Sequence, residues 1–270
     1  MTSTSESTPQ SPRIETAAIA AHQRRNVGEV VGRLRALAER CGVTIVEEPR
    51  DAQLTIALGG DGTILRALAH LLGSGVPVLG VNYGRVGFLA SIPPERMEQD
   101  LERVLRGEYT VVELPTLELK LNGHRHVAVN DVVVTSSTLG RMVELAWSIG
   151  GEDVGTVPCD GMICATPSGS TAYNLSNGGP VLVRGLDAMA ITFIAPHSLH
   201  ARPLVVARGQ RLTIRNATAD VGCAVLVDGR RTAELEPGAS ADVYLCEQRT
   251  LLATLPETSF FRRYREVFAS

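Results

Sequence analysis

The loop Gly59-Gly60-Asp61-Gly62-Thr63 is the stretch of this chain whose residue types and spacing most clearly suggest chemistry. The mostly apolar run at 54–58 before it predicts a buried strand, and the run at 64–72 after it predicts a helix. Glycines between a strand and a helix let a ligand approach the backbone closely. A helix start also presents unpaired N–H groups and the positive end of the helix dipole. This loop therefore suits a phosphate group.

Asp61 is the unusual residue of this loop, because a carboxylate repels a phosphate. Its presence has a purpose if it holds a metal ion or accepts the proton of an attacking hydroxyl. A plainer interpretation is an ordinary strand-to-helix turn in which Asp61 has a capping role. We expect Thr63 to cap the helix and Gly73 to end it. One helical face is expected to contain Leu65, Leu68, Ala69 and Leu72.

A second polar stretch runs from Asp160 to Pro180 and contains the sequence Thr-Pro-Ser-Gly-Ser-Thr-Ala-Tyr at 166–173. Its hydroxyl groups offer neutral donors and acceptors for sugar hydroxyls and amides, and Tyr173 offers a stacking face for a heterocycle. Hydroxyl residues are also common in turns and caps, so a purely structural loop is the alternative. No Gly-x-Ser-x-Gly motif is present, so a hydrolase serine is not indicated.

Three shorter motifs follow predicted strands or turns. Asn130-Asp131 could bind a base edge or a ribose, or could simply form an Asx turn. His197 and His200 are three residues apart without a further ligand pattern, so a zinc site is not indicated. Asp228-Gly229 is typical of a hairpin turn.

The composition excludes several classes of function. The net charge of −3 gives no indication of binding to nucleic acid or to an anionic membrane. No apolar run approaches the ~18 residues that a membrane span needs. Lys120 is the only lysine and follows no glycine-rich loop, which excludes a Walker A loop and a protein-kinase site. The cysteines form no Cys-x-x-Cys pair, which indicates free thiols in a reducing cytoplasm.

The elements that must position these residues begin with an α/β pattern. Residues 1–13 are rich in Ser, Thr and Pro and predict a disordered tail without a signal peptide. Residues 14–110 predict an α/β domain that carries the loop at 59–63. Its strands are expected at 16–22, 43–46, 54–58 and 76–82, and its helices at 27–41, 64–72 and 95–106. This order favours an open, mostly parallel sheet with helices on its faces.

Residues 111–250 predict a β-rich domain. Asn122-Gly123 is a strong hairpin signal between strands at 117–121 and 126–134. Further short strands are expected at 142–149, 162–165, 190–194, 211–215, 224–227 and 241–246, a spacing typical of an antiparallel sandwich or a barrel-like domain. The segment 251–270 is expected to return to the first domain, with a short helix at 260–268.

In combination and in chain order, these motifs resemble the NAD kinase family. That family shares its Gly-Gly-Asp-Gly core with diacylglycerol, sphingosine and 6-phosphofructo-kinases. The resemblance covers roughly residues 16–268 and is carried by Gly59–Thr63, Gly87-Phe88-Leu89, Asn130-Asp131, 166–173, 176–180, 195–199 with Arg202-Pro203, and Asp228-Gly229. A lone Gly-Gly-Asp-Gly is weak evidence, whereas the serine/threonine block together with Ala-Pro-His-Ser-Leu at 195–199 is highly specific.

The resemblance implies an N-terminal open α/β sheet domain, a C-terminal β-sandwich-like domain and an active site at their junction. It implies transfer of a phosphoryl group from ATP or polyphosphate to the 2′-hydroxyl of the adenosine ribose of NAD, giving NADP. Magnesium, or another divalent metal, would accompany the donor without a metal site of the protein's own. The protein would be a cytoplasmic homodimer or homotetramer.

By the same resemblance, Asp61 would be the catalytic proton acceptor. The residues that would bind the dinucleotide or the donor are Gly60, Gly62, Arg66, Asn130, Asp131, Arg141, Asp160, Ser168, Thr171, Ala172, Tyr173, Asn174, Leu175, Ser176 and Ala195. The chain departs from the family pattern at Asp131, where glutamate is usual, at Asn177, where alanine is usual, and at Pro158, where a basic residue is frequent. Arg141 could supply the diphosphate contact that Pro158 cannot make.

Two other functions remain open from the sequence. A lipid or sphingoid kinase of the same superfamily would need an apolar acyl-binding surface, which the polar stretch at 166–176 argues against. A sensor that binds NAD or NADP without turnover is compatible with the departures at Asp131 and Pro158. The kinase gives Asp61 a task, because a ribose hydroxyl is a poor nucleophile and needs a base.

Overall fold

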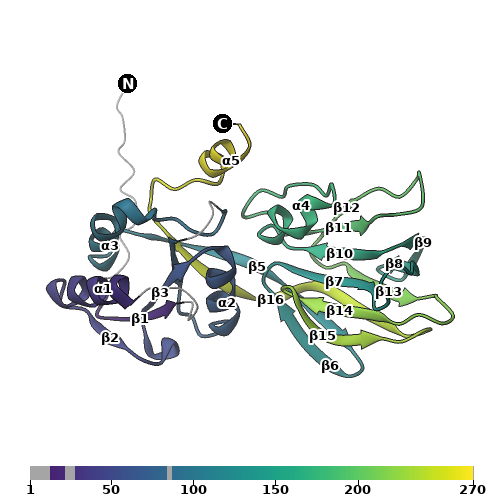
Figure 1. The fold of residues 1–270 in the computed structure, drawn as a ribbon, viewed down its shortest axis with the longest axis horizontal. Helices are drawn as coiled ribbons and strands as arrows, with labels where there is room; N and C mark the ends of the chain where they lie inside the picture. The colour runs from purple at the N-terminus through teal and green to yellow at the C-terminus, as the bar shows by residue number, and fades with distance from the viewer. Residues whose placement is uncertain (1–12, 22–27, 84–86, 270) are drawn as a thin grey trace. The chain divides into compact units, whose positions relative to one another are not determined.

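A computed structural model of the chain describes residues 13–21, 28–83 and 87–269 (Figure 1). The chain divides into two compact units, the first made of Met1–Glu113 with Leu251–Ser270 and the second of Leu114–Thr250. The predicted tail at 1–13 lies outside the described residues except for Arg13, as do the predicted strand end at 22 and helix start at 27. No helix in the described part of the chain is long and apolar enough to cross a membrane.

The first unit is built on a parallel sheet with the strand order β2-β1-β3-β4. Its strands are β1 (Thr16–Ala21), β2 (Thr44–Val46), β3 (Leu54–Gly59) and β4 (Val78–Asn82). The end of β16 (Ser240–Thr254) extends this sheet, because Leu252 pairs in parallel with Val78. β3 is buried along its whole length, as expected for a parallel strand covered on both faces.

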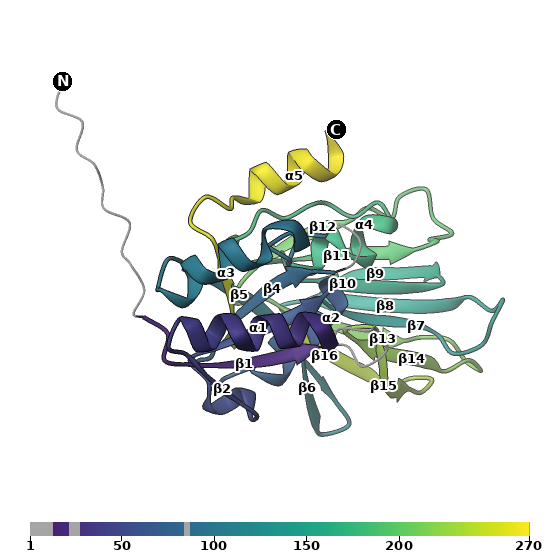
Figure 2. The same ribbon diagram turned by 60° about the vertical axis from the view of Figure 1, so that its left-hand side comes forward.

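Helices cover this sheet in the order that the sequence predicts. They are α1 (Gly28–Arg40), α2 (Asp61–His70) and α3 (Met97–Leu105), with short 3-10 helices at Pro49–Asp51 and Pro94–Arg96. A further helix, α5 (Phe260–Phe268), follows β16 and buries none of its residues. Leu34 and Leu37 of α1 share one core with Leu101 and Val104 of α3. Figure 1 shows α1 and α3 on one side of β1 and β3 and α2 on the other, and Figure 2 shows α1 lying along β1.

The buried face of α2 differs from the predicted one. Its inward side chains are Ile64, Ala67, Leu68 and Leu71. Leu65 and Leu72 are only half-buried, and Ala69 is exposed. Because almost every residue from 64 to 72 is apolar, the sequence alone is compatible with either face.

The ends of α2 also differ from the prediction. The helix begins at Asp61 with Gly60 as the N-cap, so Thr63 lies inside the first turn and is not the cap. Leu71 is the C-cap, and Gly73 lies beyond it with φ 74°. Gly73 therefore turns the chain after the helix has already ended.

The last helix of the chain packs onto the loop that follows β4. The ring centroid of Phe88 lies 6.0 Å from that of Phe260 and 5.6 Å from that of Phe268. Arg263 donates a hydrogen bond to the carbonyl oxygen of Ala90 at 2.5 Å. α5 therefore helps to hold residues 88–90 in place.

The second unit is a sandwich of two largely antiparallel sheets, which confirms the predicted fold class. One sheet has the order β12-β11-β10-β7-β14-β15, and the other contains β5, β6, β8, β9, β13 and the first part of β16. The Trp147 and Phe193 rings pack edge to face in the common core, with their centroids 5.6 Å apart.

The strands of this unit are β5 (Thr110–Leu121), β6 (His124–Ala128), β7 (Asp131–Ser136), β8 (Val143–Ile149), β9 (Glu152–Cys159), β10 (Gly161–Ala165), β11 (Ala188–Ile194), β12 (Leu204–Ala207), β13 (Arg211–Asn216), β14 (Cys223–Val227) and β15 (Arg230–Leu235). Short helices lie at Gly169–Thr171 and at α4 (Tyr173–Ser176).

Two features of this unit differ from the sequence prediction. The strand expected at 126–134 is broken at Val129-Asn130, so that β6 pairs with β5 while β7 joins the other sheet. β9, β12 and β15 were not expected. They lie at sheet edges and are largely exposed, so their sequences lack the apolar alternation of a half-buried strand.

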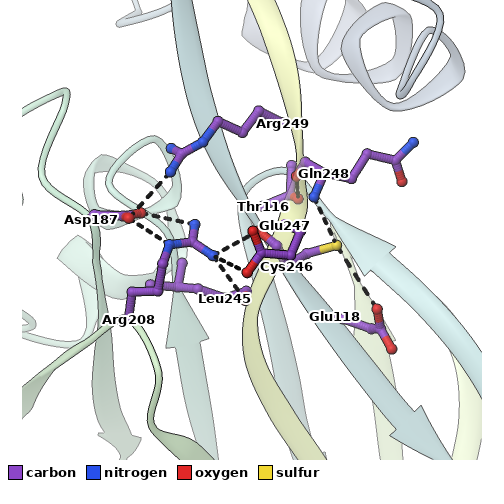
Figure 3. Close-up of polar contacts among 9 residues, drawn as sticks. All are labelled: Thr116, Glu118, Asp187, Arg208, Leu245, Cys246, Glu247, Gln248 and Arg249. Atoms are coloured by element: carbon purple, nitrogen blue, oxygen red, sulfur yellow. Dashed lines mark hydrogen bonds and ion pairs between the residues drawn. The ribbon is translucent and has the colours of Figure 1, made fainter.

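A cluster of polar contacts supports β16 where its pairing with β13 ends at Tyr244 (Figure 3). Arg208 donates from Nε and Nη2 to the two carboxylate oxygens of Asp187 at 2.5 and 2.9 Å. Its Nη1 donates to the carbonyl oxygens of Leu245 and Cys246 at 3.2 and 3.0 Å. The hydrogen bonds from Arg208 lower the pKa of Asp187. Arg208 also donates to the carbonyl groups of Leu245 and Cys246, which follow the last β16 residue that pairs with β13.

We expect Ile64→Ala to lower the free energy of unfolding by about 2–5 kcal/mol, because it removes a fully buried side chain from the inner face of α2. Leu65→Ala is the matched control, and it should cost clearly less because Leu65 is only half-buried. Urea denaturation of both variants measures the difference. Equal losses, or a larger loss in Leu65→Ala, would contradict the assigned face.

Candidate functional site

The glycine-rich loop forms a tight turn between β3 and α2. β3 ends at Gly59, and Gly60 caps α2 with φ −86° and ψ −177° and no side-chain bond. A Cβ at Gly59 would overlap the side chain of Thr63, so glycine lets Thr63 fold over the strand end. A Cβ at Gly62 would meet nothing within 4 Å, so the space beside the first helical turn is open. This turn can admit a ligand at the helix start.

The Asp61 carboxylate accepts three consecutive backbone N–H groups from the loop after β4. Oδ2 accepts from Phe88 at 2.7 Å, and Oδ1 accepts from Leu89 at 3.2 Å and Ala90 at 3.4 Å. Each carboxylate oxygen can accept two hydrogen bonds, so Oδ1 is filled, and the described residues leave one acceptor position on Oδ2. Asp61 therefore does cap backbone groups, although in a neighbouring loop, and it can still accept a proton.

Two neighbours shape the surroundings of this carboxylate. A Cβ at Gly87 would overlap the Asp61 carboxyl group, so only glycine at position 87 leaves room for this carboxyl group. Arg66 is exposed one turn further along α2, with its Nη2 3.5 Å from the Thr63 hydroxyl. The start of α2 thus combines backbone donors, a carboxylate acceptor and a cation.

In the second unit, one end of the six-stranded sheet gathers three polar motifs of the sequence. β7 begins at Asp131, opposite Ala165 where β10 ends. β14 ends at Val227, opposite Val132 of β7. Because these strands are neighbours, Asn130-Asp131, the loop 166–176 and the turn Asp228-Gly229 lie together, and we call this region the polar end.

Backbone contacts lock the Asn130 turn to the loop after β10. Thr166 donates from its backbone N–H to the carbonyl oxygen of Asn130 at 2.9 Å and from its hydroxyl to that of Val129 at 2.7 Å. A Cβ at Gly169 would overlap the Asn130 carbonyl group, so glycine is required for this approach. The glycine of Ser-Gly-Ser therefore fixes two predicted motifs against each other.

Asn174 stabilises the loop 166–176 from inside. Its Nδ2 donates to the carbonyl oxygens of Ser170 and Pro180, both at 3.0 Å, and its Oδ1 accepts from the Thr192 hydroxyl at 2.6 Å. The residue is fully buried. Its side chain therefore bonds within the protein, and the expected contact of Asn174 with the dinucleotide stays a prediction.

The outer surface of the same loop is more open. Tyr173 is 47% exposed, so its ring can offer the expected stacking face. Ser176 is exposed as well, whereas Ser168, Thr171, Ala172 and Leu175 are half-buried. The Thr171 hydroxyl donates to the carbonyl oxygen of Ser168 at 3.2 Å, which leaves its oxygen able to accept.

Asn130 and Asp131 present polar atoms that the described residues leave unpaired. Oδ1 of Asn130 is buried and accepts no hydrogen bond within the described part of the chain. Asp131 is 5% exposed, and no described residue hydrogen-bonds to its carboxyl group. A buried polar group without a partner costs about 1–3 kcal/mol, which a bound ligand can recover. Both residues fit a ligand at the polar end.

Asp228 is a residue of this region that the sequence reasoning did not assign to the site. Its Oδ1 accepts from the backbone N–H groups of Asn130 at 2.7 Å and Asp131 at 3.2 Å, and its Oδ2 accepts from Val129 at 3.0 Å. The predicted hairpin turn is present, with Asp228 at φ 49°. These three hydrogen bonds to Asp228 depend on the pairing of β14 with β7, which no local sequence signal reveals.

Asp160, Ala195 and Arg141 are not brought to the polar end. Asp160 and Ala195 flank the pair Gly161 and Ile194, at the other end of β10. β10 is 5 residues long, which separates the two ends by roughly 15 Å. Arg141 follows β7 on that same side and pairs with Asp220 at 2.9 Å. In the second unit the predicted site residues thus form two separate groups.

A pocket of about 280 Å³ lies elsewhere in the first unit, lined mainly by residues of the segments 91–96 and 255–259 and of α5. Its charged groups are largely paired with one another, Arg96 with Asp100 at 2.9 Å and Arg263 with Glu266 at 3.1 Å. Neither Asp61 nor any other predicted site residue lines it. This pocket therefore does not support the predicted chemistry.

A phosphate-suited turn with a poised carboxylate, and a β-sandwich with a polar loop, define a nucleotide-binding protein of the kinase class. The family model described as ATP-NAD kinase N-terminal domain matches residues 7–109, and the one described as ATP-NAD kinase C-terminal domain matches residues 129–255. The chain belongs to the NAD kinase family.

Individual relatives agree with this assignment. A protein named NAD kinase from Heliobacterium modesticaldum is 38% identical over 222 residues, which are 80% of this chain and 78% of that protein. The NAD kinase of Bacteroides fragilis is 40% identical over 184 residues, which are 66% of this chain and 63% of that protein. The crystal structure of an NAD kinase from Archaeoglobus fulgidus in complex with ATP has a TM-score of 0.78 and 26% identity, and the match covers 94% of this chain and 97% of that one.

We expect Gly169→Ala to lower the free energy of unfolding by about 1–3 kcal/mol, because the added methyl group overlaps the Asn130 carbonyl group. Gly32→Ala is the control. A Cβ at Gly32 meets nothing within 4 Å, and alanine favours the helix in which it lies. Urea denaturation measures both effects. Wild-type stability in Gly169→Ala would show that the loop after β10 does not approach the Asn130 turn this closely.

Proposed function

We propose that this protein transfers a phosphoryl group from ATP or polyphosphate to the 2′-hydroxyl of the adenosine ribose of NAD, giving NADP. The observation that carries the proposal is the Asp61 carboxylate at the start of α2, which accepts three backbone N–H groups and to which the described residues leave an acceptor position on Oδ2. Membership of the NAD kinase family supports NAD as acceptor. The ATP named with the Archaeoglobus fulgidus kinase supports ATP as donor.

In this proposal Asp61 is the base. The ribose oxygen attacks the terminal phosphorus of the donor, the bond from that phosphorus to the leaving oxygen breaks, and the ribose proton moves to Oδ2 of Asp61. The three N–H bonds fix the orientation of the carboxylate before the transfer. A general base of this kind typically contributes about 10²–10⁴-fold to the rate.

The donor phosphates need positive charge, and the start of α2 offers little of it. The open space beside Gly62 and the N–H groups of the first turn suit one phosphate, and Arg66 supplies one cation. No group of three or more His, Cys, Asp or Glu that could hold a metal occurs among the described residues. We therefore propose that magnesium, or another divalent ion, arrives with the donor and neutralises its phosphates.

We further propose that the polar end binds the dinucleotide. Oδ1 of Asn130 would accept a hydrogen bond, the hydroxyls of Ser168 and Thr171 would bind sugar or amide groups, and Tyr173 would stack on a ring. Ala172, Leu175 and Ser176 lie in the same loop. The contacts predicted for Asp160, Arg141 and Ala195 stay predictions, because these residues lie at the other end of the sheet.

The family resemblance also leads us to propose a homodimer or homotetramer in the cytoplasm. The five cysteines, Cys41, Cys159, Cys164, Cys223 and Cys246, are all unpaired and buried. Free thiols are typical of a reducing compartment. Sedimentation velocity of the purified protein tests the proposed assembly.

A matrix of donors and acceptors tests the proposed reaction. The purified protein is incubated with ATP or polyphosphate, with NAD or NADH, and with magnesium, and the phosphorylated product is measured. We expect NADP from NAD. Calorimetric binding of NAD without any product would identify a sensor, and absence of product with every donor would overturn the proposed reaction.

We expect Asp61→Asn to lower kcat by roughly 100- to 10,000-fold, because an amide cannot accept the proton of the ribose hydroxyl. NAD binding should stay within about threefold of the wild type, since Asp61 is assigned to the chemical step. Asp51→Asn, at an exposed position of the same unit, is the matched control and should keep full activity. Full activity in Asp61→Asn would refute its assignment as the base.

A further inference from the structure

Two acidic residues lie next to each other at the polar end, and only one of them has partners. The Asp228 carboxylate accepts three backbone N–H groups, at 2.7 Å from Asn130, 3.0 Å from Val129 and 3.2 Å from Asp131. Asp131 itself is 5% exposed, and its carboxyl group receives no hydrogen bond from the described residues. The two neighbouring acids therefore occupy very different environments.

The groups that face Asp131 cannot neutralise a charge on it. They are Asp228 from the turn between β14 and β15, and Cys164 from β10. The Cys164 thiol is buried, and burial raises its pKa, so it stays neutral. Arg230 lies beyond Asp228 and acts on that residue. Two buried like charges side by side are disfavoured, so the second of these acids to ionise loses its proton only at a higher pH.

The hydrogen bonds decide which acid keeps it. Burial raises the pKa of Asp228, but the three N–H bonds from residues 129–131 oppose this and stabilise its charged form. Burial, followed by the nearby charge of Asp228, raises the pKa of Asp131 to about 7. Asp228 therefore ionises first, and Asp131 holds its proton up to neutral pH.

We propose that Asp131 and Asp228 share a single negative charge, located on Asp228, and that neutral Asp131 donates a hydrogen bond to an acceptor atom of the bound dinucleotide. The hydrogen bond to the dinucleotide depends on the proposed function, whereas the single charge shared by the two acids does not. Asp228 is then a positioning residue, because it orients the Asn130-Asp131 turn and keeps its neighbour protonated. Asn130 supplies an acceptor and Asp131 a donor from adjacent positions of one turn.

The pH dependence of binding has a definite sign. Asp131 is a donor below about pH 7 and becomes an acceptor-only carboxylate above it. NAD affinity should therefore be highest on the acidic side and fall by up to about tenfold for each pH unit above 7. A site in which Asp131 binds as a carboxylate would show the opposite trend, with affinity rising as the proton leaves.

Asp131→Asn provides the matched test, because the amide has a similar size and donates at every pH. Calorimetry of NAD binding between pH 6 and 9 should show the fall for the wild type and a variation of less than about threefold for Asp131→Asn. Asp153→Asn, at an exposed position of the same unit, should behave like the wild type. The same pH profile in the wild type and in Asp131→Asn would overturn the donor role.

A second measurement locates the proton without any ligand. The wild type is labelled with ¹³C at the aspartate carboxyl groups, and the Asp131 signal is identified by its loss in Asp131→Asn. We expect a titration midpoint near pH 7, and a midpoint near the ordinary aspartate value of about 4 would overturn the shared charge. If the wild type failed to bind NAD, both the proposed function and the donor role of Asp131 would be refuted. The NMR titration midpoint of Asp131 would still show whether the two acids share one charge.

Asp228→Asn separates the charge of Asp228 from its contacts. Removal of the like charge should lower the Asp131 midpoint, because that charge adds to the effect of burial. An unchanged midpoint in a folded Asp228→Asn variant would refute Asp228 as the charge partner. If this variant does not fold, the midpoint in the wild type and its absence in Asp131→Asn still decide where the proton lies.

Discussion

A carboxylate that accepts three consecutive backbone N–H groups is the interaction on which both units depend. In the first unit Asp61 binds residues 88–90, and in the second Asp228 binds residues 129–131. Residues 88–90 lie outside regular strands and helices, and residues 129–131 comprise two irregular residues and the first residue of β7. The carboxylates therefore satisfy backbone donors where regular strand pairing is absent or only begins. A hydrogen bond to a charged group contributes about 1.5–3 kcal/mol, so each carboxylate can fix an irregular segment firmly.

Glycines and the C-terminal helix complete these two arrangements. Gly87 and Gly169 each stand where a Cβ would overlap an essential group, the Asp61 carboxyl in one case and the Asn130 carbonyl in the other. α5 supports the first arrangement from outside, through the Phe88 ring contacts and the bond from Arg263 to Ala90. The C-terminal helix therefore supports the loop whose N–H groups bind Asp61.

The features that the sequence predicts well are local ones. The strand, turn and helix around Gly59–Thr63 follow from residue types within one short window, and so does the order of elements in the first unit. The buried face of α2 does not, because its apolar residues surround the helix and only the sheet selects Ile64 and Leu68. The pairing of β14 with β7, which brings Asp228 to Asn130, joins segments about a hundred residues apart and leaves no local signal.

Aspartate stands at position 131, where the resembling family usually has glutamate, directly beside the hydrogen bonds of Asp228. The backbone N–H of Asp131 is itself bound by Asp228, so the two acids belong to one turn of the backbone. An aspartate carboxyl stays close to that turn and is buried there. A glutamate side chain is one methylene longer, so its carboxyl group could not occupy the same buried position beside Asp228. If Asp131 holds its proton as we propose, the shorter side chain keeps a polar group at this position and offers a donor there instead of an acceptor-only carboxylate.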